Sequence, residues 1–153
     1  MSNSVFKFKK FTIIHNSGVM KVGTDGVLLG AYLDATNYSN ILDVGTGTGL
    51  VALMLAQKSN AKITAIDINP LAFANASENI NNSPWHNRVE VINISLQKFV
   101  PKNKFDLIVS NPPFFDTDIH APDKKRAVAR HTLELRHEDI LDFTNVFLLD
   151  RGH

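Results

Sequence analysis

The chain alternates short apolar runs with longer stretches whose apolar residues recur at helical spacing. Helical spacing marks residues 50–57, 70–81 and 137–150. The short runs, which are typical of buried strands, are ILDV at 41–44, KITAIDI at 62–68, VEVINI at 89–94 and FDLIVS at 105–110. Strands that alternate with helices pair in parallel through right-handed crossovers. The pattern therefore predicts an α/β fold with a doubly wound, mostly parallel sheet.

Two helix starts are marked by residues that suit a first turn. Asn69 is predicted to be an N-cap with Pro70 at the first helical position, and this helix is expected to continue to about Asn81. Nearer the amino terminus, Thr24 is predicted to be an N-cap and Asp25 a first-turn acid. One helix is therefore expected before the first strand of the sheet and another after the second.

Length and composition indicate a single domain over residues 1–153. Domains cluster near roughly 100 to 150 residues, and 44% hydrophobic with 20% charged residues is ordinary for a globular protein. The absence of cysteine excludes disulfides and thiolate metal sites. No run approaches the roughly 18 apolar residues of a membrane span, and the start MSNSVFKFKK has no apolar signal segment. We expect a cytoplasmic protein with no membrane and no metal partner.

The net charge of +1 hides two basic patches. The first consists of Lys7, Lys9, Lys10 and Lys21, and the second of Lys124, Lys125, Arg126, Arg130 and Arg136, with His131 inside it. Such patches bind phosphates in nucleic-acid-binding proteins, although two solvated faces of an ordinary protein would have the same composition.

Chemistry is expected at the carboxyl ends of the strands, where doubly wound sheets bind ligands. The sequence DVGTGTG follows the first strand, and its Gly45, Gly47 and Gly49 permit a tight turn whose N–H groups approach a nucleotide-like ligand. A nicotinamide-binding G-x-G-x-x-G fingerprint would require glycine at position 50, where the chain has Leu50. This spacing argues against a nicotinamide oxidoreductase.

Two acidic residues lie near the glycine loop. Asp67 ends the second strand, 18 residues beyond Gly49, at the position from which a carboxylate accepts hydrogen bonds from both hydroxyls of a ribose. Asp43 precedes Gly45 by two residues. Its carboxylate could face the ammonium group of a ligand, or it could hold the loop in place, and the sequence leaves these two interpretations open.

The sequence NPPFF follows the fourth strand. An exocyclic amine on a base is a poor nucleophile because its lone pair is delocalised into the ring. The side-chain oxygen of Asn111 and the carbonyl of Pro112 could accept the two amine hydrogens and localise that lone pair. Pro112 and Pro113 restrict the backbone and so preorganise these acceptors, while Phe114 could stack on the base. A strand terminated by prolines, with phenylalanines in the core, is the alternative for NPPF taken in isolation.

The combination of G-x-G-x-G after a first strand with an acid ending the second resembles the S-adenosylmethionine-dependent methyltransferases. The resemblance implies a Rossmann-like class I fold in which the glycine loop meets the methionine part and Asp67 holds the ribose. It also implies adenine contacts near Ser95 and Leu96, although many relatives carry aspartate where this chain has Ser95. The implied cofactor-binding residues are Lys21, Thr24, Asp25, Asp43, Gly45, Thr46, Gly47, Gly49, Asp67, Ile68, Ser95, Leu96 and Asn111.

NPP followed by an aromatic residue resembles the amino-methyltransferases. More of the chain looks like one subgroup, the bacterial tRNA adenine-N6 methyltransferases that act on the adenosine beside the anticodon of a valine tRNA. The similarity rests on FTIIHNSGVMKVGTDGVLLGAYL, ILDVGTGTGLVALMLAQ, FDLIVSNPPFF and RAVARHTLELRHEDIL. It implies that residues 1–37 cover the cofactor, with Lys21, Thr24 and Asp25 near its methionine end, and that 38–153 form the catalytic core. The catalytic residues would be Asn111, Pro112, Pro113 and Phe114.

Several alternatives remain beside this resemblance. Relatives often carry tyrosine where Phe114 stands, and phenylalanine after NPP also resembles the ribosomal RNA guanine-N2 enzymes. Arg126, Arg130 and His131 could contact RNA or pack a helix. A module that binds nucleic acid or cofactor without catalysis is the alternative from a different functional class.

The resemblance also bears on the carboxyl end of the chain. It implies that a fifth strand begins near 149–153 and that two more follow, so the sheet is expected to lack its last three strands. We therefore expect a fragment with an open edge beside the fourth strand, from a protein that is a monomer at full length.

Overall fold

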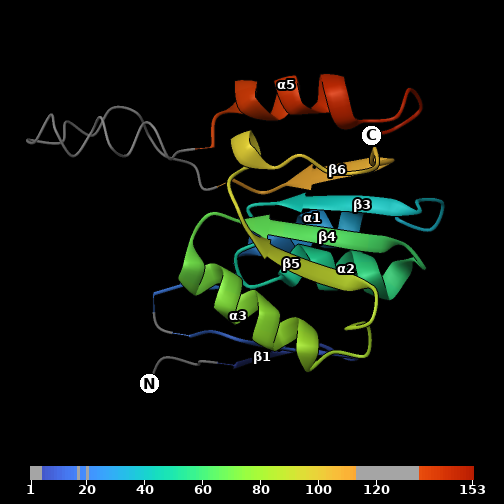
Figure 1. Ribbon diagram of the computed structural model, residues 1–153. Coiled ribbons are helices and arrows are strands. Elements are labelled where there is room, and N and C mark those ends of the chain that lie inside the picture. The colour runs from blue at the N-terminus through green and yellow to red at the C-terminus, as the bar shows by residue number, and fades with distance from the viewer. Residues whose placement is uncertain (1–4, 17, 20, 113–134) are drawn as a thin grey trace, which may run out of the picture.

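A four-stranded parallel sheet lies at the centre of the computed structural model, which describes residues 5–16, 18–19, 21–112 and 135–153 (Figure 1). The strand order is β5-β4-β3-β6, and each neighbouring pair is parallel. The strands are β3 (Asn40–Val44), β4 (Lys62–Asp67), β5 (Val89–Asn93) and β6 (Leu107–Ser110). The predicted strands are therefore confirmed, as is the doubly wound order in which the chain returns past β3 to add β6.

The predicted helices are also present. They are α2 (Leu50–Lys58), α3 (Pro70–Asn81) and α5 (His137–Phe147), with a 3₁₀ turn η1 (Leu96–Lys98) after β5. Helix α3 begins as predicted, because the Asn69 side chain accepts a hydrogen bond from the Leu71 N–H at 2.9 Å. None of the helices in the described residues is long and apolar enough to cross a membrane.

The helix near the amino terminus, α1 (Thr24–Tyr32), starts one residue earlier than predicted. Gly23 occupies the N-cap position with φ −97° and ψ 158°, and no side chain caps the helix. Thr24 is therefore the first helical residue and not the N-cap. Asp25 is a first-turn acid, as predicted.

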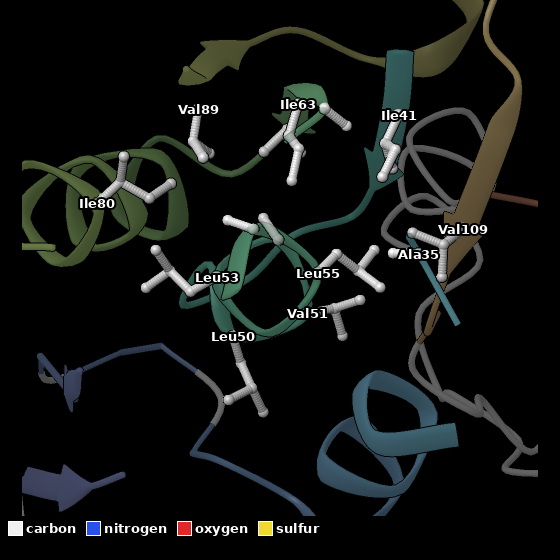
Figure 2. Packing of buried hydrophobic residues seen from close by; sticks show 14 of the residues in the cluster. Ala35, Ile41, Leu50, Val51, Leu53, Leu55, Ile63, Ile80, Val89 and Val109 are labelled. Carbon is white, nitrogen blue, oxygen red and sulfur yellow. The ribbon is translucent and has the colours of Figure 1, made fainter. Parts of the chain in front are cut away.

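Two apolar layers cover the two faces of the sheet, because successive strand residues point to opposite sides. Ile41 and Ile63 pack with α2 and with Ile80 of α3 on one face, whereas Leu42 and Ile66 pack with Phe143 of α5 on the other. Figure 2 shows the first layer around α2, with Leu53 on the side of Ile80 and Leu50 pointing away from the strands. Helix α2 is buried on most sides, so its sequence is apolar nearly all round.

An antiparallel hairpin of β1 (Val5–Lys7) and β2 (Thr12–Ile14) precedes α1 and was not predicted. Its strands have three residues each, too few for a recognisable alternation. The Phe8 and Phe11 rings stack at 4.5 Å within its turn, and tertiary packing holds the hairpin because Phe11 meets Trp85 edge-on at 5.7 Å.

The last residues of the chain pair with the free side of β6. Phe105 and Leu148 form a parallel bridge, and the Leu149 N–H donates to the Phe105 carbonyl at 2.9 Å. Further along, the Ile108 N–H donates to the His153 carbonyl at 2.8 Å. The edge beside β6 is therefore partly covered and not open as the sequence predicted, because the chain after α5 returns alongside this strand.

Helices α1 and α2 approach closely through two glycines. A Cβ atom on Gly26 would lie 3.2 Å from Leu50 Cδ2, and one on Gly30 would lie 2.6 Å from Met54 Sδ. The carboxyl end of α1 is held by Lys58 of α2, whose Nζ donates to the carbonyls of Gly30 at 2.8 Å and Leu33 at 3.0 Å. The approach of Gly26 to Leu50 fixes α1 against the beginning of α2, and the Lys58 hydrogen bonds fix it against the end.

Replacement of Gly30 by alanine is expected to destabilise the chain by about 1 to 2 kcal/mol. Overpacking costs about 1 to 3 kcal/mol, and the better helix propensity of alanine returns about 0.5 to 1 kcal/mol. The added methyl would also lie 2.9 Å from Met54 Cβ, so α1 has to move. Urea unfolding of Gly30→Ala, Met54→Ala and the double variant measures the effect. The double variant should lose less than the sum of the single losses, and simple additivity would contradict a clash between these residues.

Candidate active site

The carboxyl ends of β3, β4, β5 and β6 meet at one edge of the sheet, and the candidate residues leave the strands there (Figure 1). Val44 pairs with Ser110, so Gly45 and Asn111 leave the sheet side by side. The Ser110 hydroxyl donates to the Val44 carbonyl at 2.9 Å and ties these two strand ends together. The strand order reverses between β3 and β6, which is where doubly wound sheets bind their ligands.

The glycine loop has the left-handed backbone that its sequence suggested. Gly45, Gly47 and Gly49 have φ values of 72°, 58° and 81°. A Cβ atom on Gly45 or Gly47 would have no other atom within 4 Å, so the backbone there faces open space. Gly49 is the N-cap of α2, whose first N–H groups add a partial positive charge beside this space. The loop therefore forms an open cradle suited to an uncharged or anionic part of a ligand.

Asp67 shapes this cradle. Its Oδ2 accepts from the Gly47 N–H at 2.9 Å and its Oδ1 from the Asn69 N–H at 2.9 Å. A carboxylate offers about four lone-pair directions, so Asp67 retains acceptor capacity for two hydroxyl groups. Asn93, which sequence reasoning missed, donates to the Asp67 carbonyl at 2.8 Å and to the Ile68 carbonyl at 3.1 Å. Its one signal in the sequence is its position at the end of the strand next to Asp67.

Asp43 lies beneath the loop and is only 2% exposed. Its Oδ2 accepts from the Thr46 hydroxyl at 2.7 Å. Burial raises the pKa of Asp43 to about 6, against the lowering effect of hydrogen bonds from Thr46 and from the Ala52 backbone, and the nearby Asp67 charge raises it further. The geometry favours the interpretation that Asp43 holds the loop. Contact with the ammonium group of a ligand stays a prediction.

Stability is expected to depend on pH through Asp43. Because its pKa in the folded chain is above the ordinary 3.8, the folded state binds the proton more tightly, and this stabilisation is lost as pH rises from about 4 through about 6. Asp43→Asn cannot ionise. The unfolding free energy of Asp43→Asn minus that of the unaltered chain should therefore rise by about 2.5 kcal/mol between pH 4 and pH 7. Urea unfolding at several pH values checks this, and a difference that is constant with pH would contradict it.

The amino-terminal segment reaches both sides of the site. A Cβ atom on Gly18 would lie 3.2 Å from Leu71 Cδ1 at the start of α3, and one on Gly26 would lie 3.5 Å from Asn111 Nδ2. We call residues 15–23 the strap: its Gly18 approaches the start of α3, and Gly26 of the following helix α1 approaches Asn111. Lys21, Thr24 and Asp25 are exposed in and after the strap.

Some of the remaining predicted residues lie at this edge of the sheet, and the others lie outside the described residues. Ser95 and Leu96 follow β5 beside Asp67, whose carbonyl accepts from the Ile94 N–H at 3.1 Å. Ile68 is 41% exposed at the same edge. Asn111 and Pro112 are half-buried. Outside the described residues lie Pro113, Phe114, Lys124, Lys125, Arg126, Arg130 and His131.

The two basic patches differ in their surroundings. Lys7, Lys9 and Lys10 are exposed on the hairpin. Of the second patch, the described residues include Arg136, which forms ion pairs with Asp139 at 3.1 Å and Glu138 at 3.6 Å. Neighbouring acids therefore offset the charge of Arg136.

Solved structures of other proteins, a methyltransferase among them, share the fold. Precorrin 8w decarboxylase of Methanobacterium thermoautotrophicum aligns with 92% of this chain and 66% of its own, with a TM-score of 0.62 and 20% identity. Protein arginine methyltransferase 10 of Arabidopsis thaliana aligns with 84% of this chain and 32% of its own, with a TM-score of 0.59 and 21% identity. At these identities the likeness establishes the fold alone, and it confirms the predicted Rossmann-like methyltransferase architecture.

Curated relatives are much closer in sequence. The chain is 51% identical to a protein of Parabacteroides distasonis across 100% of this chain and 65% of the relative. It is 50% identical to one of Phocaeicola vulgatus (94% of this chain, 58% of the relative) and 46% identical to one of Haemophilus influenzae (97% and 66%). Each of the three is named tRNA1(Val) (adenine(37)-N6)-methyltransferase. The chain thus spans 58% to 66% of the length of these relatives.

A family model described as the methyltransferase small domain matches residues 10–136. The match includes the strap, the glycine loop, Asp67 and the whole NPPF sequence. It therefore covers each part of the site that the strand ends bring together. On this match and on the shared fold, the chain belongs to the methyltransferase small domain family.

Proposed function

We propose that this chain binds S-adenosylmethionine and transfers its methyl group to the N6 amine of an adenine in tRNA, the adenosine beside the anticodon of a valine tRNA. One observation carries the proposal: strand register places Asn111 next to the glycine loop, and Asp67 binds that loop. The names of the curated relatives support the choice of tRNA and of adenine. From the proposed tRNA substrate we also infer a cytoplasmic location.

The described residues fit this cofactor. The open backbone at Gly45 and Gly47 leaves room for the methionine part, and the free acceptor capacity of Asp67 suits the two ribose hydroxyls. Ile68, Ser95 and Leu96 are assigned to the adenine side, and Lys21, Thr24, Asp25 and Thr46 to the methionine side. When bound, S-adenosylmethionine supplies a methyl group made electrophilic by its sulfonium.

The role of Asn111 and Pro112 follows from the chemistry of the amine. Their side-chain and backbone oxygens accept its two hydrogens, which favours a pyramidal nitrogen with a localised lone pair. The nitrogen bonds to the methyl carbon as the carbon–sulfur bond breaks, and the amine proton leaves afterwards to water. Preorganised acceptors of this kind lower the activation barrier of a transfer reaction by roughly several kcal/mol. Pro113 is assigned the restriction of the Pro112 backbone, and Phe114 the stacking of the base.

The test is the identity of the methylated base. The 153-residue chain is incubated with unmodified total tRNA and rRNA and S-adenosylmethionine carrying a deuterated methyl group. Mass spectrometry of digested nucleosides should detect labelled N6-methyladenosine in the tRNA fraction. Labelled N2-methylguanosine in its place would overturn the adenine assignment. Cofactor binding without a labelled nucleoside would favour the non-catalytic module.

A further inference from the structure

The buried side chain of Asn79 on α3 joins two parts of the molecule that are far apart in the sequence. It is 1% exposed. Its Nδ2 donates to the Thr48 carbonyl in the glycine loop at 2.9 Å and to the Ile14 carbonyl in β2 at 3.1 Å. Its Oδ1 accepts from the Ile14 N–H at 2.9 Å. Both N–H groups and the oxygen of this one amide are therefore in use, shared between the loop and the hairpin.

Asn75, one turn earlier on the same face of α3, forms its hydrogen bonds within the described residues to the amino-terminal side of this junction. It is 0% exposed. Its Nδ2 donates to the Ile14 carbonyl at 2.9 Å, and its Oδ1 accepts from the Asn16 N–H at 3.4 Å. The bond to Thr48 therefore distinguishes Asn79 from its neighbour. The two residues can therefore be compared: Asn75 bonds to the amino-terminal segment, whereas Asn79 bonds to both the hairpin and the glycine loop.

The position of the Thr48 carbonyl affects the geometry of the glycine loop, because the same peptide unit closes the turn. Its peptide carries the Gly49 N–H, which donates to the Thr46 carbonyl at 2.9 Å and so closes the turn. Asp43 and Asp67 hold the first half of the loop through Thr46 and Gly47. Asn79 holds its second half. A buried amide costs free energy unless all its polar atoms are paired, so undocking of β2 would leave Asn79 poorly satisfied and loosen its hold on the loop.

We propose that Asn79 is a positioning residue that couples docking of β2 to the shape of the glycine loop, so that cofactor binding and docking of the amino-terminal segment stabilise each other. Beyond β2 the chain approaches both sides of the site, through Gly18 at Leu71 and through Gly26 of α1 near Asn111. Coupling through Asn79 therefore links this amino-terminal segment to the glycine loop. The inference rests on the proposed cofactor, and the coupling is reciprocal because it is a free energy shared by the two events.

Binding and hydrogen exchange of the 153-residue chain test the coupling. Calorimetry with S-adenosylhomocysteine should show about 10-fold weaker binding by Asn79→Leu and a change under about threefold for Asn75→Leu. Saturating S-adenosylhomocysteine should slow amide exchange across residues 12–16 in the unaltered chain and in Asn75→Leu. In Asn79→Leu this ligand-induced slowing should be absent. Asn81→Leu, on an exposed position of α3, is the matched control and should behave as the unaltered chain in both measurements.

A second variant at the same position tests whether a loss of affinity in Asn79→Leu results from misfolding of that variant. Asn79→Asp keeps an acceptor for the Ile14 N–H but, when ionised, donates neither to Thr48 nor to Ile14, so it should show the same loss of affinity while the bond from Asn75 to the Ile14 carbonyl still holds the hairpin. Thermal unfolding without ligand verifies that each variant is folded. Failure of the unaltered chain to bind S-adenosylhomocysteine would overturn the proposed cofactor and this inference with it. Normal binding by the unaltered chain, with equal affinity in folded Asn79→Leu or Asn79→Asp, would overturn the coupling alone.

Discussion

Replacement of Asn111 by alanine is expected to slow methyl transfer by about 100- to 1,000-fold, the usual cost of removing one preorganised polar group from a reacting centre. Binding of S-adenosylhomocysteine should weaken far less than the rate falls, because a lost transition-state contact lowers the rate without a matching loss of ground-state affinity. Asn111 lies beside the glycine loop through the pairing of Val44 with Ser110, and it is half-buried. The measurement is the single-turnover rate of methyl incorporation into tRNA, with calorimetry for binding.

Asn111→Asp is the informative companion to this variant. Its carboxylate keeps an oxygen that accepts an amine hydrogen, so it should retain more of the rate than alanine does. Ser110→Ala is the matched control next to it, since it removes the bond to the Val44 carbonyl but no proposed contact with the amine. An unchanged rate in Asn111→Ala, or equal losses of rate and of affinity, would refute the assignment of Asn111 to the transition state.

Replacement of Asp67 by alanine is expected to weaken S-adenosylhomocysteine binding by about 100-fold, which corresponds to about 2.7 kcal/mol. Hydrogen bonds to a charged group contribute about 1.5 to 3 kcal/mol each, and two ribose hydroxyls would lose their acceptor. The change also releases the N–H groups of Gly47 and Asn69. Asp67→Asn, which keeps an oxygen for one of these two N–H groups, helps to separate the two effects and should lie between alanine and the unaltered chain.

Glu90→Gln is the control for the loss of a negative charge. Glu90 is exposed near the amino end of β5 and accepts from the Thr64 hydroxyl at 3.0 Å, away from the carboxyl ends of the strands. Its replacement should leave cofactor affinity unchanged. Should Glu90→Gln and Asp67→Ala weaken binding equally, overall charge and not a ribose contact would explain the result.

Much of the fold follows from local patterns. Runs such as 41–44 and 105–110 are apolar on both faces because both faces of a parallel sheet are covered, and that pattern is visible without a structure. The start of α3 was predictable from an equally local pattern, since the Asn69 side chain accepts a hydrogen bond from the N–H two residues later. The hairpin and the Gly23 cap escaped prediction because short strands and single-residue shifts leave no periodic signal.

By itself, the sequence determined which residues stand at strand ends: Gly45, Asp67 and Asn111 each follow an apolar run, and parallel pairing brings such ends to one edge. Only the tertiary structure decided how the loop is held. The burial of Asp43, and the bond from Asn79 to Thr48 across 31 residues of chain, depend on the packing of α2 and α3 against the sheet. An asparagine in a helix looks the same in sequence whether it faces water or two backbone carbonyls. What surrounds it is fixed by non-local contacts, which no local pattern encodes.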